Sequence, residues 1–222
     1  MYIQLNGQVI YYEKHGEGSP VILVHGNKET HRIFQVLVPE LSKKHTVYAL
    51  DSRGHGFSSA VNEYHYSDMA EDVAAFVHAL ELVRPAYYGF SDGGIIGLIA
   101  ASRYPAMFSA LAVSGANLTP SGFKFFPRLS IWFQSLADKD PLVRLMQKEP
   151  HITKADLARI TVPTLVLAGE KDMVKKSETK RIAASVLDAS LQILPGETHA
   201  SYVVKSPKLF PLLDEFFSAH CY

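Results

Sequence analysis

A chain of 222 residues with 47% hydrophobic and 20% charged side chains has the size and composition of one globular domain with a substantial core. Its formal net charge is zero and it contains no lysine or arginine run, so we expect no electrostatic binding to nucleic acid or to a membrane surface. The stretch 1–12 does not resemble a signal peptide, and the longest apolar-rich run, 93–101, is too short to cross a bilayer. A single cysteine, Cys221, excludes an internal disulfide and favours a reducing, cytoplasmic setting.

The first half of the chain alternates predicted strands and helices. Two β-type runs over 1–5 and 9–13 meet at Asn6-Gly7, a pair typical of a tight hairpin. The run VILV, Val21–Val24, is continuously apolar, as in a strand buried on both faces of a sheet. The elements predicted next are an irregular helix over 33–41 with Pro39, a strand over 46–50, a helix over 67–82 capped by Ser67, a strand over 86–90 and a helix over 93–103.

The second half resumes the alternation after a long interruption. Its predicted elements are strands over 108–114, 164–168 and 191–194 and helices over 175–186 and 207–219. Strands that alternate with helices of this length predict an α/β fold with a mostly parallel central sheet and helices on both faces.

The interruption, residues 117–159, is too long to be a structureless loop in a compact domain. We therefore predict a short, partly helical lid inserted into a core formed by 1–116 and 160–222. One interpretation of its aromatic residues is that they only pack the lid onto the core; the other is that some of them line the substrate pocket. The aromatic candidates for substrate contact are Phe123, Phe126, Trp132 and Phe133.

A candidate nucleophile lies at the junction of a predicted strand and a predicted helix. Ser91 is flanked by Gly89 and Gly93 in the pattern GxSxG, between the strand 86–90 and the helix 93–103. Glycines at these positions leave room for a tightly packed turn because they carry no Cβ atom. Such a turn exposes the serine hydroxyl at the carboxyl edge of the sheet, beside a helix N-terminus that stabilises negative charge.

A serine hydroxyl is a weak nucleophile until a base takes its proton, and the base must itself be oriented by a third group. Asp172 follows the predicted strand 164–168, and His199 follows the predicted strand 191–194. Both side chains are therefore expected at the sheet edge where Ser91 points. The order Ser, Asp, His along the chain is typical of this architecture.

Other acids compete for the role given to Asp172. Asp51 comes too early in the strand order, and Asp140 falls in the predicted lid. The loop after the strand 108–114 is another possible position for the acid, but it offers Asn117 instead of a carboxylate. Asp172 is therefore favoured.

The remaining histidines have simpler interpretations. His25 and His55 lie in His-Gly turns and are expected to be structural. No pair has a spacing such as HExxH, so we expect no metal site. The histidines expected to be solvated or partly packed are His15, His31, His45, His65, His78, His151 and His220.

Several motifs in order along the chain resemble those of one family. They are HGN (25–27), DSRGHGFS (51–58), GFSDGG (89–94), AGEKD (168–172) and THAS (198–201). Together they resemble the α/β-hydrolase superfamily, and within it the small esterase, haloperoxidase-like and biphenyl-hydrolase-like serine hydrolases. The resemblance implies that Ser91, Asp172 and His199 form a catalytic triad without a cofactor. It also implies an oxyanion hole made by the backbone N–H groups of Asn27 and Asp92.

The sequence departs from the family pattern in two places. Its lid is short, and Asp92 follows the nucleophile where Met or Gln is common. The amide of Asp92 can serve an oxyanion whatever its side chain is, but its carboxylate would repel that charge and is expected to point away. One interpretation is that the carboxylate caps the following helix; the other is that it attracts a cationic group of the substrate, such as an α-amine. Some amino-acid ester hydrolases of the superfamily share the SDGG motif.

The expected function is cleavage of a small carboxylic ester through an acyl-serine intermediate. The same three residues also suit hydrolysis of a C–C bond, a thioester or an amide, and perhydrolysis. An alternative of another class is a non-catalytic ligand-binding protein built on a hydrolase fold. A dinucleotide-binding motif at 89–94 is excluded, because the motif is not in the first strand–helix unit and Ser109 stands where an acid is required.

Overall fold

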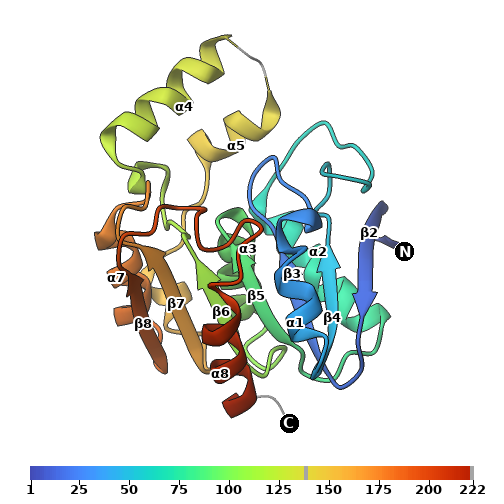
Figure 1. Ribbon diagram of the computed structural model, residues 1–222. Coiled ribbons are helices and arrows are strands. Elements are labelled where there is room, and N and C mark those ends of the chain that lie inside the picture. Colours follow the sequence, from blue (N-terminus) through green and yellow to red (C-terminus); the bar gives the residue numbers. More distant parts are fainter. Residues whose placement is uncertain (138–139, 221–222) are drawn as a thin grey trace.

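The computed structural model describes residues 1–137 and 140–220, and these residues build one eight-stranded sheet (Figure 1). The strand order across the sheet is β1-β2-β4-β3-β5-β6-β7-β8. The strands are β1 (Tyr2–Leu5), β2 (Gln8–His15), β3 (Ser19–Val24), β4 (His45–Leu50), β5 (Ala86–Phe90), β6 (Leu111–Ser114), β7 (Thr164–Gly169) and β8 (Ala189–Leu194).

Strand directions confirm the prediction of a mostly parallel sheet. Every neighbouring pair from β4 to β8 in the sheet order is parallel, whereas β2 is antiparallel to both β1 and β4. The hairpin that joins β1 and β2 turns at Asn6 and Gly7, whose φ angles are 48° and 75°. Two successive positive φ angles are typical of the turn that matches the twist of paired strands.

Helices cover both faces of the sheet, and each face has its own hydrophobic core. In β3, Ile22 and Val24 point to one core, while Val21 and Leu23 point to the other. The first core includes side chains of α2, α3 and α7, and the second includes side chains of α1 and α8, which lie in front of the sheet in Figure 1. These helices are α1 (Leu37–Leu41), α2 (Tyr66–Ala79), α3 (Asp92–Arg103), α7 (Lys176–Ser185) and α8 (Phe210–His220).

Three local predictions need correction. The irregular helix expected over 33–41 is a short 3-10 helix, η1 (His31–Phe34), followed by α1, whose first turn accommodates Pro39 because amides there have no intrahelical acceptor. The strand expected from residue 108 begins only at Leu111.

The third correction concerns the start of α2. This helix begins at Tyr66, so Ser67 lies inside it and is not the cap. The carboxylate of Glu149 accepts a hydrogen bond from the Tyr66 N–H at 3.0 Å and also contacts His65 Nδ1 at 2.6 Å. Glu149, more than 80 residues away in sequence, thus caps the start of α2 in place of Ser67.

We call residues 117–159 the lid segment and treat it as an insertion into a core of 1–116 and 160–222. It contains η2 (Pro120–Gly122), α4 (Phe125–Ala137), α5 (Pro141–Lys148) and α6 (Lys154–Leu157), and α4 and α5 stand above the sheet in Figure 1. Its second half packs closely on the body, because Leu145, Ile152 and Leu157 belong to the core on the α3 side.

The aromatic residues of the lid segment divide into two groups. Phe123 is buried and packs with Ile131, Val143 and Val174, which attaches the lid segment to the body. The other three aromatic candidates are exposed over half or more of their surface: Phe126, Trp132 and Phe133.

Two further findings concern the whole described chain. No helix in residues 1–137 and 140–220 is long and apolar enough to cross a membrane. In the same residues, no three His, Cys, Asp or Glu side chains are grouped so that they could hold a metal ion. Cys221 lies outside the described residues.

Candidate active site

Ser91 sits on a sharp turn between β5 and α3. Its backbone has φ 53° and ψ −112°, a conformation that costs a non-glycine residue about 1–3 kcal/mol. The turn packs so closely that a Cβ on Gly89 would lie 2.1 Å from the carbonyl oxygen of Gly93, and a Cβ on Gly93 would lie 2.1 Å from that of Val24. Both glycines are therefore required by the backbone, as the sequence pattern predicts.

His199 and Asp172 meet Ser91 at the carboxyl edge of the sheet. His199, in the loop after β8, places Nε2 3.0 Å from Ser91 Oγ and Nδ1 2.7 Å from Asp172 Oδ1. Asp172, in the loop after β7, is buried and also accepts a hydrogen bond from the Val174 N–H at 2.8 Å. The imidazole ring lies against Phe90, with ring centroids 4.9 Å apart. A hydroxyl, an imidazole and a carboxylate thus form one hydrogen-bonded chain.

Gly115, which the sequence reasoning missed, makes room for His199. It follows β6 directly and has φ 63°, in the left-handed region that favours glycine. A Cβ at this position would lie 2.7 Å from Cε1 and 2.9 Å from Nδ1 of His199. The sequence signal for this role is that a glycine directly follows the predicted strand 108–114.

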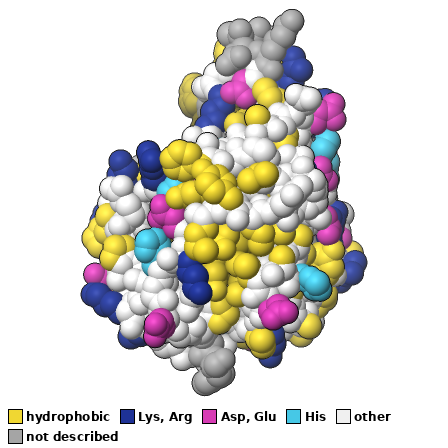
Figure 2. Space-filling model, turned by 90° about the vertical axis from the view of Figure 1, so that its right-hand side faces the viewer, with side chains coloured by type: hydrophobic (Ala, Val, Ile, Leu, Met, Phe, Trp, Pro, Cys, Tyr) yellow, Lys and Arg dark blue, Asp and Glu magenta, His cyan; other side chains and the backbone are white. Residues whose placement is uncertain are grey.

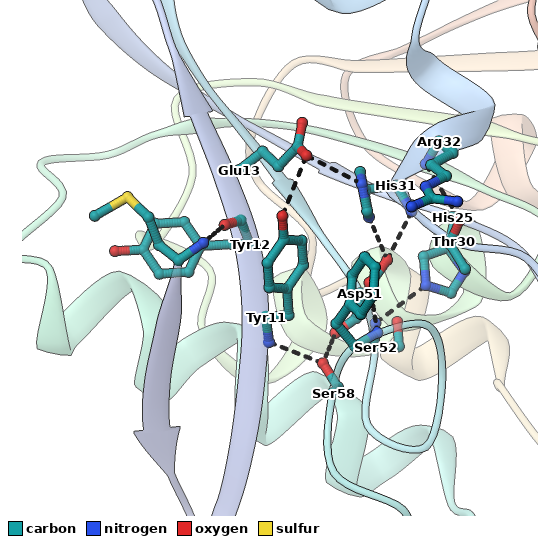
Figure 3. Close-up of polar contacts among 12 residues, drawn as sticks. Tyr11, Tyr12, Glu13, His25, Thr30, His31, Arg32, Asp51, Ser52 and Ser58 are labelled. Atoms are coloured by element: carbon teal, nitrogen blue, oxygen red, sulfur yellow. Dashed lines mark hydrogen bonds and ion pairs between the residues drawn. The ribbon is translucent and has the colours of Figure 1, made fainter.

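The two acids that compete with Asp172 for the third position of the triad, Asp51 and Asp140, bind other groups. Asp51 is fully buried, and it accepts hydrogen bonds from the backbone N–H of His31 and of Phe57, while its Oδ1 lies 2.8 Å from His31 Nδ1 (Figure 3). It therefore shapes the loop after β4. Asp140 caps α5 by accepting from the Leu142 N–H and forms an ion pair with Lys28 at 2.6 Å.

Two histidines expected to be solvated or partly packed are buried. His31 is 6% exposed and His45 is 4% exposed. His31 lies between two carboxylates, with Nδ1 near Asp51 and Nε2 3.3 Å from Glu13 Oε1 (Figure 3). Burial of His31 is possible because both of its ring nitrogens find partners.

The loop after β3 holds the Gly26–Asn27 peptide in a fixed orientation. His25 Nδ1 lies 2.7 Å from the carbonyl oxygen of Gly26, and His25 Nε2 accepts a hydrogen bond from the Ser52 N–H at 3.1 Å. This pattern requires a neutral imidazole that donates from Nδ1. Burial, with the nearby His55 as a second cause, lowers the pKa of His25 to about 4, in agreement with that state. Since a trans peptide points its N–H opposite to its carbonyl, the Asn27 amide is oriented as well.

Asp92 is the first residue of α3, so its amide has no acceptor within the helix. Its carboxylate does not cap the helix, contrary to one interpretation of the sequence. Instead Oδ2 accepts from Asn27 Nδ2 at 2.9 Å and Oδ1 accepts from the Tyr66 hydroxyl at 2.8 Å. Burial raises the pKa of Asp92, and these two hydrogen bonds oppose that shift. The carboxylate is therefore turned into the protein, as expected if it must avoid an oxyanion.

Glu29 is a second carboxyl group beside the serine that the sequence reasoning did not identify. Its Oε2 accepts a hydrogen bond from the Gly26 N–H at 3.0 Å. A Cβ on Gly26 would lie 2.7 Å from Glu29 Oε2 and 3.0 Å from Ser91 Cβ, so the carboxyl and the serine flank the same small space. Burial raises the pKa of Glu29. Its position two residues after the HGN motif gave no sign of this contact.

The sheet, the strand-to-helix turn that carries Ser91, and the acid and histidine on later loops together define a hydrolase of the α/β class. The chain belongs to the alpha/beta hydrolase fold family, whose model matches residues 19–144. Its relatives include the serine hydrolase BPHL of Homo sapiens, which is 26% identical over 96% of this chain and 84% of that protein. Another is the AB hydrolase superfamily protein YisY of Bacillus subtilis, 25% identical over 97% of this chain and 98% of that protein.

The solved structures agree with this assignment at the level of the fold. The enol-lactonase from Burkholderia xenovorans superposes with a TM-score of 0.84 at 19% identity, over 98% of this chain and all of that one. The meta-cleavage product hydrolase from Pseudomonas fluorescens superposes with a TM-score of 0.79 at 22% identity. These similarities confirm the predicted α/β-hydrolase fold.

Proposed function

We propose that the protein is a cofactor-free serine hydrolase that cleaves small carboxylic esters through an acyl-serine intermediate. The observation that carries the proposal is the hydrogen-bonded chain from Asp172 through His199 to Ser91. A serine at the tip of a strained turn, with a base in contact, has the arrangement that nucleophilic catalysis needs. We also propose that this enzyme works in the cytoplasm.

Each residue then has one role in the reaction. His199 Nε2 takes the proton of Ser91 Oγ as the oxygen attacks the ester carbonyl, and Asp172 holds the imidazole in the required tautomer and stabilises its cation. The N–H groups of Asn27 and Asp92 hold the tetrahedral oxyanion. His199 next protonates the leaving alcohol, and water repeats the sequence on the acyl-enzyme to release the acid.

A fluorophosphonate probe together with the Ser91→Ala variant tests the proposal. The probe should label Ser91 in the unmodified protein, and the variant should lose both labelling and hydrolysis of p-nitrophenyl acetate. Ser109→Ala, at a serine in the segment before β6, is a matched control that should keep both. Intact hydrolysis in Ser91→Ala would contradict the proposal, and turnover near the spontaneous rate with tight ligand binding would favour a binding protein.

The bond that is cleaved needs its own experiment, because one triad serves many acyl transfers. Proteins similar to this chain include a pimeloyl-[acyl-carrier protein] methyl ester esterase and a 2-hydroxy-6-oxo-2,4-heptadienoate hydrolase. We favour esters, and a panel of an ester, a thioester, an amide and a dienoate substrate at equal concentration separates the alternatives. A higher kcat/KM for a substrate other than the ester would replace this part of the proposal.

A second candidate substrate class is an ester whose acyl group carries an amine. The Glu29 carboxyl lies beside Ser91, and an ammonium group placed near its ionised form would gain favourable electrostatic energy. We therefore expect an aminoacyl p-nitrophenyl ester to be a better substrate than its acyl analogue. Glu29→Gln should reduce that advantage, and an unchanged ratio in this variant would eliminate this candidate.

A further inference from the structure

Helix α4 carries an apolar stripe that faces solvent. Five large apolar side chains on this helix are exposed: Phe125 (70%), Phe126 (79%), Leu129 (37%), Trp132 (50%) and Phe133 (57%). Their spacing places all five on one side of an α-helix, at about 100° of rotation per residue. The aromatic rings also contact one another, with Phe125 and Phe126 centroids 5.5 Å apart and Trp132 and Phe133 centroids 5.0 Å apart.

The stripe points away from the rest of the protein. The side of α4 that meets the body carries Ile131, which is buried with Phe123, Val143 and Val174. At about 100° per residue, Ile131 lies nearly opposite the centre of the stripe. An ordinary surface helix buries its apolar stripe, whereas α4 stands above the sheet (Figure 1) and its apolar stripe is exposed to solvent. Large exposed apolar surfaces of this kind mark interaction sites.

The charges of the helix indicate what covers it. The segment 123–137 contains two cations, Lys124 and Arg128, and the nearest acids along the chain, Asp138 and Asp140, come after the end of α4. Neither cation forms an ion pair with any residue in 1–137 or 140–220. A helix with Trp, Phe and Leu on one face, and with basic side chains in and just before its first turn, has features of helices that lie in the interface of an anionic membrane.

We propose that α4 docks the protein on an anionic lipid surface, with the aromatic stripe in the headgroup region and Lys124 and Arg128 near lipid phosphates. A second copy of the chain is the alternative occupant, and the experiment below distinguishes the two. The proposal revises the expectation of no membrane contact, which rested on the net charge of the whole chain and on the absence of a basic run.

A second exposed apolar surface does not support the same inference. Figure 2 shows hydrophobic side chains gathered on the face that carries the β1–β2 hairpin. There Phe57 contacts Tyr11, which donates to the Glu13 carboxylate, and the Arg32 guanidinium covers the Phe57 ring at 5.4 Å. Here the Phe57 ring is covered by a cation and its neighbour Tyr11 is bonded to an acid, unlike the exposed stripe of α4, so Phe57 provides a control position.

The only tryptophan of the chain, Trp132, lies in the stripe and reports directly on docking. The full chain is mixed with vesicles of phosphatidylcholine alone or of equal parts phosphatidylcholine and phosphatidylglycerol. We expect a blue shift of Trp132 emission and co-sedimentation with the anionic vesicles, both weakened by high salt. The double variant Phe126→Ser, Phe133→Ser should bind about tenfold more weakly, since two side chains no longer enter the interface.

Control variants distinguish docking through α4 from non-specific adsorption to vesicles. Phe57→Ser should bind anionic vesicles like the unmodified protein, and Lys124→Gln with Arg128→Gln should lose the preference for anionic over neutral vesicles. Circular dichroism of each variant confirms that the fold is retained. The proposal is overturned if Trp132 emission does not respond to vesicles, if the stripe variant binds equally well, or if the shift follows protein concentration without lipid, which would identify a second copy as the occupant.

Discussion

Asn27 and Asp92 are joined by a hydrogen bond of 2.9 Å between Asn27 Nδ2 and Asp92 Oδ2. Asn27 lies in the loop after β3 and Asp92 is the first residue of α3, and their backbone amides are the two proposed oxyanion donors. The side-chain contact therefore ties together two amides that must point at the same oxygen atom. Asn27 Nδ2 also lies 3.4 Å from the carbonyl oxygen of Leu142, at the start of α5. The lid segment therefore contacts the same Asn27 side chain that binds Asp92.

Replacing Asn27 by alanine should damage catalysis without removing a reacting group. We expect kcat to fall about tenfold, less than the ~3 kcal/mol typical of losing a whole oxyanion donor, because the amide remains but is less firmly held. The free energy of unfolding should fall by about 2 kcal/mol, since the buried Asp92 carboxylate loses a partner. Steady-state kinetics and urea unfolding measure the two effects. Asn62→Ala, at an exposed loop position, should change neither, and an unchanged kcat in Asn27→Ala would remove the link from the mechanism.

The identity of the acid can be tested by comparing two aspartates. Asp172→Asn should lower kcat by a factor on the order of 10⁴, because an amide cannot hold His199 in the tautomer that accepts a proton at Nε2. Asp140→Asn removes a rival acid that caps α5 and pairs with Lys28, and it should change kcat by no more than about twofold. Equal losses in the two variants would show that Asp172 has no special role.

Gly115 allows a steric prediction with a close control. Gly115→Ala would place a Cβ 2.7 Å from His199 Cε1, so the imidazole must shift and kcat should fall at least tenfold. Gly196→Ala introduces alanine at a similar φ, 73° compared with 63°, but nothing lies within 4 Å of its Cβ. Both variants should lose about 1 kcal/mol of stability from backbone strain, measured by urea unfolding. If Gly196→Ala loses as much activity as Gly115→Ala, strain and not the contact with His199 is responsible.

The fold and the three central site residues could be predicted because their signals are local. Alternation of strands and helices predicts a parallel sheet, and residues after parallel strands share one edge, so Ser91, Asp172 and His199 are expected to lie together there. The VILV run likewise predicted burial on both faces, and its residues alternate between the two cores.

The features of the fold and the site that the sequence did not predict depend on contacts between segments distant in sequence. Glu149 caps α2 from the lid segment, and the sequence around Ser67 does not indicate that a distant residue takes the capping role. Glu29 reaches Gly26 because the loop folds back, and Gly115 is required only because His199 arrives from another loop. The exposed stripe of α4 was also hidden, since its apolar spacing is the same whether the helix faces the body or solvent.

The buried His25 predicts a specific dependence of stability on acid. Its pKa is about 4 in the folded protein and about 6.5 in the unfolded chain, so below pH 6.5 only the unfolded chain gains the proton. The contribution is therefore fully present above pH 6.5 and is lost as the pH falls to 4, by about 3 kcal/mol in all. Urea unfolding at pH 7, 5.5 and 4.5 measures this loss. His25→Gln should start less stable at pH 7 and decline less steeply, whereas His151→Gln, at an exposed position, should follow the unmodified protein. An equally steep decline in His25→Gln would mean that other groups cause the acid sensitivity.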